Sequence, residues 1–179
     1  MKEISNVSMG IDKISNSPLV FLRVEDTNMV VPIWIGPCEA GVLALILRKE
    51  EFERPLTHDL ILSVIQKLGA KPLKVMIDRF KRDIFYAKLV LKDVNSKEIK
   101  IDARPSDCII IALKENIPIY IDDNIVRDHA IDSSLFYDFN LEENEEEKKD
   151  FRKEIENFDI DELRRIFEER ENDDDDDDV

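Results

Sequence analysis

Apolar residues follow two different spacings along this chain, and the change from one to the other marks its elements. Over 2–12 they alternate loosely with polar residues, at the two-residue period of β-strands, and the apolar runs 19–24 and 29–35, separated by a turn at 25–28, predict a second and a third strand. Pro32 predicts an edge position or a bulge for the third strand. Gly36-Pro37 then begins a helical pattern that runs to about Arg48 and is apolar nearly all round, which predicts a helix covered on most sides.

A second helix is predicted from about 58 to 68, with signals at both ends. Pro55 disfavours a helical backbone at Arg54, Thr57 is a good N-cap, and Gly69 suits the left-handed position that closes a helix. The apolar positions of this helix predict a stripe that packs into the core: Leu60, Ile61, Val64, Ile65 and Leu68.

Alternation returns over 71–93, where two strands flank a turn near 81–83 and predict a hairpin. A short strand over 99–102, an apolar helix that includes 108–113 and a buried strand over 118–121 follow. These elements predict an α+β fold, with a mixed and mostly antiparallel sheet or sheets packed against three apolar helices. The domain is expected to span residues 1–135.

The rest of the chain has a different composition. Residues 136–171 are rich in Glu and Lys, with apolar positions that predict short amphipathic helices, and residues 172–179 contain six consecutive aspartates and are expected to be disordered. Of the formal charge of −15, residues 142–179 carry −13, from 20 acidic and 7 basic residues. The domain is therefore nearly neutral, and nucleic acid is not excluded as its partner.

The hairpin over 71–92 concentrates positive charge, with seven cations against Asp78 and Asp83. Phe80 and Tyr86 lie between these charges, and cations interleaved with aromatic rings are typical of a surface that binds a nucleic-acid strand. The alternative is an ordinary solvated sheet face. The residues expected to contact nucleic acid are Lys71, Lys74, Arg79, Lys81, Arg82 and Lys88.

Two predicted helix starts share one arrangement. Arg54-Pro55 precedes His58 and Asp59, and Arg104-Pro105 precedes Asp107. The two starts either converge on one site for an anionic ligand, or form an arginine–carboxylate pair that ties two helices together. Glu39, in the first turn of the first helix, is either a functional carboxylate or a complement to the helix dipole.

Three separated blocks together resemble the bifunctional nuclease domain family. They are 32–36 (Pro-Ile-Trp-Ile-Gly) with Glu39-Ala40, 54–59 (Arg-Pro-Leu-Thr-His-Asp) and 101–107 (Ile-Asp-Ala-Arg-Pro-Ser-Asp). The resemblance covers roughly residues 4–135, and Cys108 departs from it where a small Ala is commoner. It implies a compact α+β domain, an oligomeric assembly, and the cleavage of DNA and RNA described for plant members. The residues it carries over are Glu39, Arg54, Thr57, His58, Asp59, Asp102, Arg104, Ser106 and Asp107.

These residues suit the hydrolysis of phosphodiester bonds. Arg54 and Arg104 would bind phosphate, and His58 is the candidate general acid or base. Asp59, Asp102 and Asp107, with Glu39, supply the oxygen ligands that Mg²⁺ or Mn²⁺ prefers, so the chemistry suggests a divalent cation although no tight ligand motif is present. The resulting hypothesis is a divalent-metal-assisted nuclease of low sequence specificity; its alternative is a non-catalytic oligomeric binding or regulatory module.

Other features bear on location. The chain has no run of about 18 uncharged apolar residues that would suit a membrane span. The first six residues, Met-Lys-Glu-Ile-Ser-Asn, include acidic and polar residues where a secretory signal would need an apolar segment, so a cytoplasmic location is expected. Cys38 and Cys108 are expected to be buried free thiols.

Overall fold

The computed structural model describes residues 1–12, 15–50 and 53–133, all of which lie in the first of the chain's two units, Met1–Leu135. The amphipathic helices expected over 136–171 and the aspartate run over 172–179 fall outside the described residues. The described unit has eight strands and four helices, so the α+β class is confirmed. None of its helices is long and apolar enough to cross a membrane.

Two antiparallel meanders make up most of the sheet. The first consists of β1 (Lys2–Asp12), β2 (Ser17–Val24) and β3 (Met29–Trp34), and the second of β4 (Lys71–Lys81), β5 (Ile84–Lys92) and β6 (Glu98–Ala103). The strand β7 (Ile119–Ile121) joins them, parallel to β4 and antiparallel to β1. With β8 (Ile131–Asp132) beside β3, the strand order is β6-β5-β4-β7-β1-β2-β3-β8.

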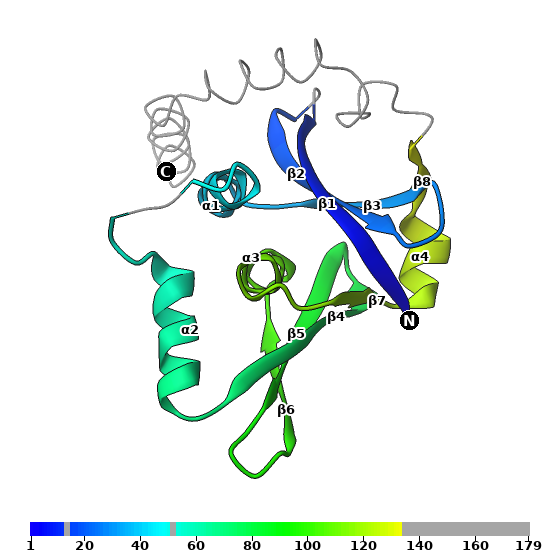
Figure 1. Ribbon diagram of the computed structural model, residues 1–179. Helices are drawn as coiled ribbons and strands as arrows, with labels where there is room; N and C mark the ends of the chain where they lie inside the picture. The colour runs from blue at the N-terminus through cyan, green and yellow to red at the C-terminus, as the bar shows by residue number, and fades with distance from the viewer. Residues whose placement is uncertain (13–14, 51–52, 134–179) are drawn as a thin grey trace, which may run out of the picture. The chain divides into compact units, whose positions relative to one another are not determined.

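Helices pack on both halves of this sheet. The helix α1 (Pro37–Leu47) contacts β2, α3 (Pro105–Glu115) contacts β4 and β5, and the two helices contact each other. Figure 1 shows α3 at the centre, between the two meanders, with α2 (Thr57–Lys67) at the side of the second meander. This position explains the apolar sequence of α3, because Cys108, Ile109, Ile110, Ile111 and Ala112 are all buried.

Several local predictions are confirmed. Phe21 of β2 faces Pro32, and β8 pairs only with the first two residues of β3, so Pro32 lies where β3 forms the edge of the sheet. Arg82 and Asp83 both have positive φ, as the two central residues of a tight hairpin turn require. Gly69 has a φ of +76° and follows α2 in the left-handed conformation.

Other predictions are wrong. A fourth helix, α4 (Asp123–His129), was not predicted; Asp122 caps it by accepting a hydrogen bond from the backbone N–H of Asn124 at 2.9 Å. Cys38 is exposed, whereas Cys108 is buried, which raises the pKa of its thiol to about 12.

The predicted core stripe of α2 is wrong for most of its members. The helix buries His58, Leu62 and Ile65, because only this narrow side contacts α3 and β4. The other predicted stripe residues remain exposed: Leu60, Ile61, Val64 and Leu68.

Two glycines provide a matched test of the backbone. Gly69→Ala should lower the free energy of unfolding by about 1 kcal/mol, because alanine is strained at positive φ. The new Cβ would also meet the side chain of Val94. Gly41→Ala should instead raise the free energy of unfolding by up to about 1 kcal/mol, since Gly41 is helical and a Cβ there meets nothing within 4 Å. Urea unfolding measures both changes in free energy. A change of the same sign in the two variants would contradict a left-handed backbone at Gly69 and a helical backbone at Gly41.

Candidate functional site

The first turns of α1, α2 and α3 bring four predicted site residues together. His58 Nε2 lies 3.1 Å from Asp107 Oδ1. Arg104, which immediately precedes α3, donates from Nε to Asp107 Oδ2 at 2.8 Å and from Nη2 to Oδ1 at 3.2 Å. The same Nη2 lies 2.7 Å from Glu39 Oε1 on α1. We call Glu39, His58, Arg104 and Asp107 the helix-start cluster.

Local sequence places each member of this cluster. Pro37 and Pro105 occupy the first turns of α1 and α3, where a missing N–H costs nothing, so both helices begin at fixed points. Gly36 has no Cβ where one would overlap the Glu39 carboxylate, so glycine lets that carboxylate fold back over the start of α1. The arginine then joins two carboxylates from different helices.

The members of the helix-start cluster differ in solvent exposure. His58 is only 6% exposed, whereas the Arg104 side chain is 66% exposed. Burial alone would raise the pKa of Asp107, but the hydrogen bonds from Arg104 and His58 outweigh it, so this pKa lies below its ordinary value. The hydrogen bond with Asp107 raises the pKa of Arg104 in turn. Asp107 is therefore ionised at neutral pH and beside a charged guanidinium.

The protonation of the histidine follows from this charge. An ionised carboxylate only accepts hydrogen bonds, so Nε2 of His58 must carry the proton that faces Asp107. Nδ1 is buried and has no hydrogen-bond partner, the only such side-chain atom in the described part of the chain. A buried polar atom without a partner is costly, and sites of proton transfer are one place where it is found.

Asp59 makes separate contacts. It accepts from the backbone N–H of Leu56 at 2.8 Å and from Lys114 Nζ at 2.7 Å. The N-cap of α2 is therefore Leu56, and the predicted cap Thr57 is the first helical residue. The Lys114 hydrogen bond lowers the pKa of Asp59 despite partial burial. Lys114 was not predicted because it lies at the far end of α3, and no local pattern relates it to Asp59.

The remaining predicted catalytic residues lie elsewhere. Arg54 lines a surface pocket of about 370 Å³ together with Asp59 and Lys114. Asp102 is exposed on β6, opposite Lys88 of β5, and Ser106 is buried beside Asp107. Among the described residues, Arg54 and Asp102 make no hydrogen bond or ion pair with the helix-start cluster, so the cluster consists of the four residues defined above.

The carboxylates predicted to bind a metal ion are not grouped into a metal site in the described part of the chain. Within residues 1–12, 15–50 and 53–133, no three His, Cys, Asp or Glu side chains are grouped to hold a metal ion. Asp59 faces Lys114, and Asp107 faces Arg104 and His58, so a cation at either carboxylate would compete with an existing positive charge or N–H. Mg²⁺ or Mn²⁺ at Asp59, Asp102 and Asp107 stays a prediction from the sequence.

The basic hairpin is partly neutralised within the protein. Lys88 pairs with Asp78, Lys74 Nζ lies 3.6 Å from Glu98, and Arg79 lies over the Tyr86 ring at 4.1 Å from its centroid. Lys71, Lys81 and Arg82 are exposed and have no ion-pair partner among the described residues. The free positive charge is therefore at the two ends of the hairpin.

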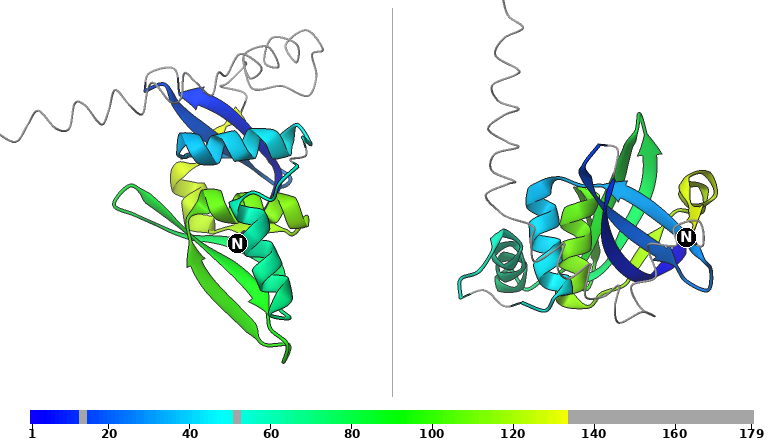
Figure 2. Two further views of the ribbon diagram at one scale, coloured as in Figure 1. Left: turned by 90° about the vertical axis from the view of Figure 1, so that its left-hand side faces the viewer. Right: turned by 90° about the horizontal axis from the view of Figure 1, so that it is seen from above.

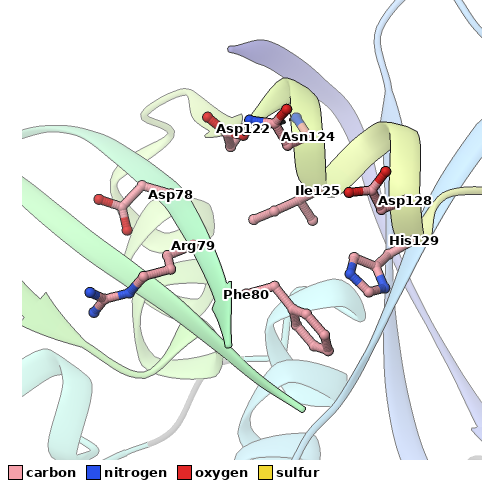
Figure 3. Close-up of a pocket in the computed structure, with 8 residues that line it drawn as sticks. All are labelled: Asp78, Arg79, Phe80, Asp122, Asn124, Ile125, Asp128 and His129. Atoms are coloured by element: carbon pink, nitrogen blue, oxygen red, sulfur yellow. Dashed lines mark hydrogen bonds between the residues drawn. The ribbon is translucent and has the colours of Figure 1, made fainter. Parts of the chain in front are cut away.

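The second histidine belongs to a different pocket. His129 lies 4.0 Å from Phe80 between ring centroids and lines a pocket of about 300 Å³ between the end of β4 and α4. Figure 3 shows its ring beside Phe80, with Asp122, Asp128 and Asn124 around the opening. Since the His129 ring packs at a tilt against Phe80 and makes no contact with the cluster, His129 serves as a control for His58.

The bifunctional nuclease domain matches residues 20–134, more than half of the chain. An uncharacterized protein of Mycobacterium tuberculosis is 37% identical over 126 residues, which cover 70% of this chain and 74% of that protein. "Bifunctional nuclease 2" of Oryza sativa subsp. japonica is 28% identical over 123 residues, 66% of this chain and 38% of the relative. "Bifunctional nuclease 1" of Arabidopsis thaliana is 28% identical over 107 residues, which cover 58% of this chain and 33% of that protein. The match therefore spans about a third of the length of each plant protein.

The cluster's contribution to stability depends on pH. Because the pKa of Asp107 is lower in the folded state, its charge stabilises the fold above about pH 4, and the stabilisation is lost as the pH falls through the folded pKa. Asp107→Asn should lower the free energy of unfolding by about 2 kcal/mol at pH 7. The difference from the wild type should shrink steadily below pH 4.

Denaturant unfolding between pH 3 and pH 7 measures this difference. Asp128→Asn is the matched control, because Asp128 pairs with Arg127 at the surface, outside the cluster. Its unfolding curve should follow that of the wild type at each pH. An Asp107→Asn deficit that is equal at pH 3 and pH 7 would show that the cluster does not stabilise through the charge of Asp107.

Proposed function

Since this chain belongs to the bifunctional nuclease domain family, we propose that it hydrolyses phosphodiester bonds in DNA or RNA with low sequence specificity, at the helix-start cluster. The observation that supports this proposal is the contact of His58 with Asp107, in which one imidazole nitrogen is held and the other has no partner. A histidine oriented by a carboxylate is a common arrangement for moving a proton in hydrolysis. The names of the plant relatives support the choice of nucleic acid as substrate.

Each cluster residue has a distinct role in this proposal. Asp107 holds the His58 ring by accepting from Nε2, and Nδ1 is the nitrogen that accepts a proton from the attacking water. Because Nδ1 is buried in the structure, this step requires that bound nucleic acid admits the water to it. The exposed guanidinium of Arg104 binds the phosphate, for which its planar donor geometry is suited. Glu39 fixes Arg104 from α1. No step is assigned to a metal ion, because the described donors do not form a site for one.

Nucleic acid would be held by charge at the ends of the β4–β5 hairpin. Lys71, Lys81 and Arg82 have no ion-pair partner among the described residues, and each cation that meets a phosphate releases counterions. Such contacts do not read base edges, which accords with low sequence specificity. We also propose that the chain works as a homo-oligomer; its cytoplasmic location stays a prediction from the sequence.

The competing proposal is a non-catalytic binding or regulatory module. The observation that favours it is the internal pairing of the cluster, because Glu39, Arg104 and Asp107 already satisfy one another and connect α1 to α3. In that case the cluster would only stabilise the helix starts. The two proposals differ in whether His58 affects turnover beyond its effect on stability.

Replacement of the two histidines separates these proposals. His58→Gln should lower the hydrolysis rate of single- and double-stranded DNA and RNA by about 100-fold or more, the usual contribution of a general acid or base. His129→Ala should leave that rate within about twofold, since His129 lies in another pocket. Assays with Mg²⁺, Mn²⁺ and EDTA test the metal prediction, and thermal melting confirms that each variant is folded. Equal rates in all preparations would favour the binding module.

The hairpin predicts a salt-dependent affinity. Lys81→Glu combined with Arg82→Glu should weaken binding to a single-stranded oligonucleotide and reduce the slope of log affinity against log salt by about two, since each phosphate contact contributes about one. Fluorescence anisotropy at several salt concentrations measures both quantities. Arg48→Glu combined with Lys49→Glu, which makes the same charge change just after α1, should alter the slope far less. An unchanged slope in the double variant would exclude the hairpin turn as a phosphate contact.

A further inference from the structure

The helix α2 carries an apolar side that the described protein leaves uncovered. Its buried residues face α3 and β4, and its polar residues Asp59, Ser63 and Gln66 lie on one flank. The opposite flank presents a row at helical spacing, in which Leu60 is 61% and Leu68 is 73% exposed. Exposed large apolar side chains gathered in this way are characteristic of an interaction surface.

The edge strand β6 continues this surface. Ile99 pairs with Leu91 and Ile101 with Leu89, and directly opposed residues of an antiparallel pair point to the same face. Leu89 and Leu91 are buried under the helices, so both isoleucines belong to the face on which the helices pack. They remain substantially exposed because β6 has no strand on its other side.

The two apolar rows lie next to each other. Asp59, on the polar flank of α2, contacts Lys114 at the end of α3, so the apolar flank turns toward the start of α3, where β6 ends. At the other end of α2, a Cβ on Gly69 would touch Val94, which is 69% exposed in the turn between β5 and β6. Figure 2 (left) shows α2 in front of the second meander, from its start beside α3 to its end beside this turn.

The size of the combined surface suits a protein interface. Leu60, Ile61, Val64, Leu68, Val94, Ile99 and Ile101 together expose roughly 600 Å² of apolar side chain, the upper end of what monomers leave exposed. A stable interface buries about 800 Å² on each partner. The backbone edge of β6 adds to this area, so the surface approaches that size.

The charges of β6 identify a second copy of this chain as the partner. When two β6 strands pair antiparallel about Ile101, Lys100 of each copy lies opposite Asp102 of the other. Pairing about Lys100 instead would place the two lysines against each other and Glu98 against Asp102. Pairing about Ile99 would match Glu98 with Lys100 but would pair only residues 98–100 of β6 with each other, whereas pairing about Ile101 pairs residues 99–103. The exposed edge is thus self-complementary about Ile101 and self-repelling one residue away.

We propose that this chain forms an isologous dimer in which β6 pairs antiparallel with β6 of a second copy about Ile101, and the apolar flanks of the two α2 helices pack over the joined strands. The two sheets then form one continuous sheet, and the apolar surface of each copy covers that of the other. The dimer does not depend on whether the chain cleaves nucleic acid.

The first test is the mass of the full chain in solution. Light scattering after size exclusion at micromolar concentration should give twice the chain mass of 20.9 kDa. Leu68→Glu and Val64→Glu should each raise the dimer dissociation constant by at least 100-fold, because a charge would be buried in the interface. Ile84→Glu is the matched control, since Ile84 is a comparably exposed residue at the start of β5, away from α2. A monomeric wild type, or a dimer that tolerates both α2 variants, would overturn the proposal.

The second test determines the register. Lys100→Glu and Asp102→Lys should each weaken the dimer, because each places like charges opposite one another at two positions. The double variant should restore it, and so should mixing the two single variants, which form complementary pairs only with each other. In a Cys38→Ser background, Ile101→Cys should give a disulfide-linked dimer on mild oxidation. Failure of both rescues to restore the dimer would contradict the pairing about Ile101.

Discussion

The contact between His58 and Asp107 is the interaction on which the organisation of this site depends. It joins the start of α2 to the start of α3, and it does so with a histidine that is nearly fully buried. Arg104 compensates the partly buried carboxylate of Asp107 and extends the connection to Glu39 on α1. Removing any one partner would leave a charge or N–H without its complement, which costs more than a surface pair contributes.

The sheet provides the rigid support for this contact. The meander β4–β5–β6 leads directly into Arg104, and the apolar side of α3 packs on β4 and β5, so the first turn of α3 is fixed to the sheet. By contrast, α2 is held by three buried residues and by the Asp59–Lys114 pair. The site therefore joins a rigid element to a weakly held one, and a partner on the exposed side of α2 would also restrain His58.

Most of the fold could be predicted from the sequence, because alternation, helix starts and turn residues are local signals. The hairpin turn at Arg82-Asp83, the edge position of Pro32 and the left-handed Gly69 all depend on neighbouring residues only. The stripe of α2 was misjudged because periodicity shows which side of a helix is apolar, but not how much of that side the domain covers. For the candidate site, the two arginine-proline helix starts predicted either a shared site or an arginine–carboxylate pair, and the structure brings Arg104, Asp107 and His58 together. Lys114 could not be found in this way, since its partner is 55 residues distant.

The state of the His58 ring tests the central claim most directly. Two-bond ¹H–¹⁵N correlation spectra of the labelled protein distinguish the two nitrogens, with and without a phosphorothioate oligonucleotide that resists cleavage. The account predicts that the neutral ring carries its proton on Nε2, that Nδ1 is bare, and that the Nδ1 resonance shifts when the oligonucleotide binds. A neutral ring protonated on Nδ1, or an Nδ1 resonance that does not respond to bound oligonucleotide, would contradict it and leave the cluster with a structural role alone.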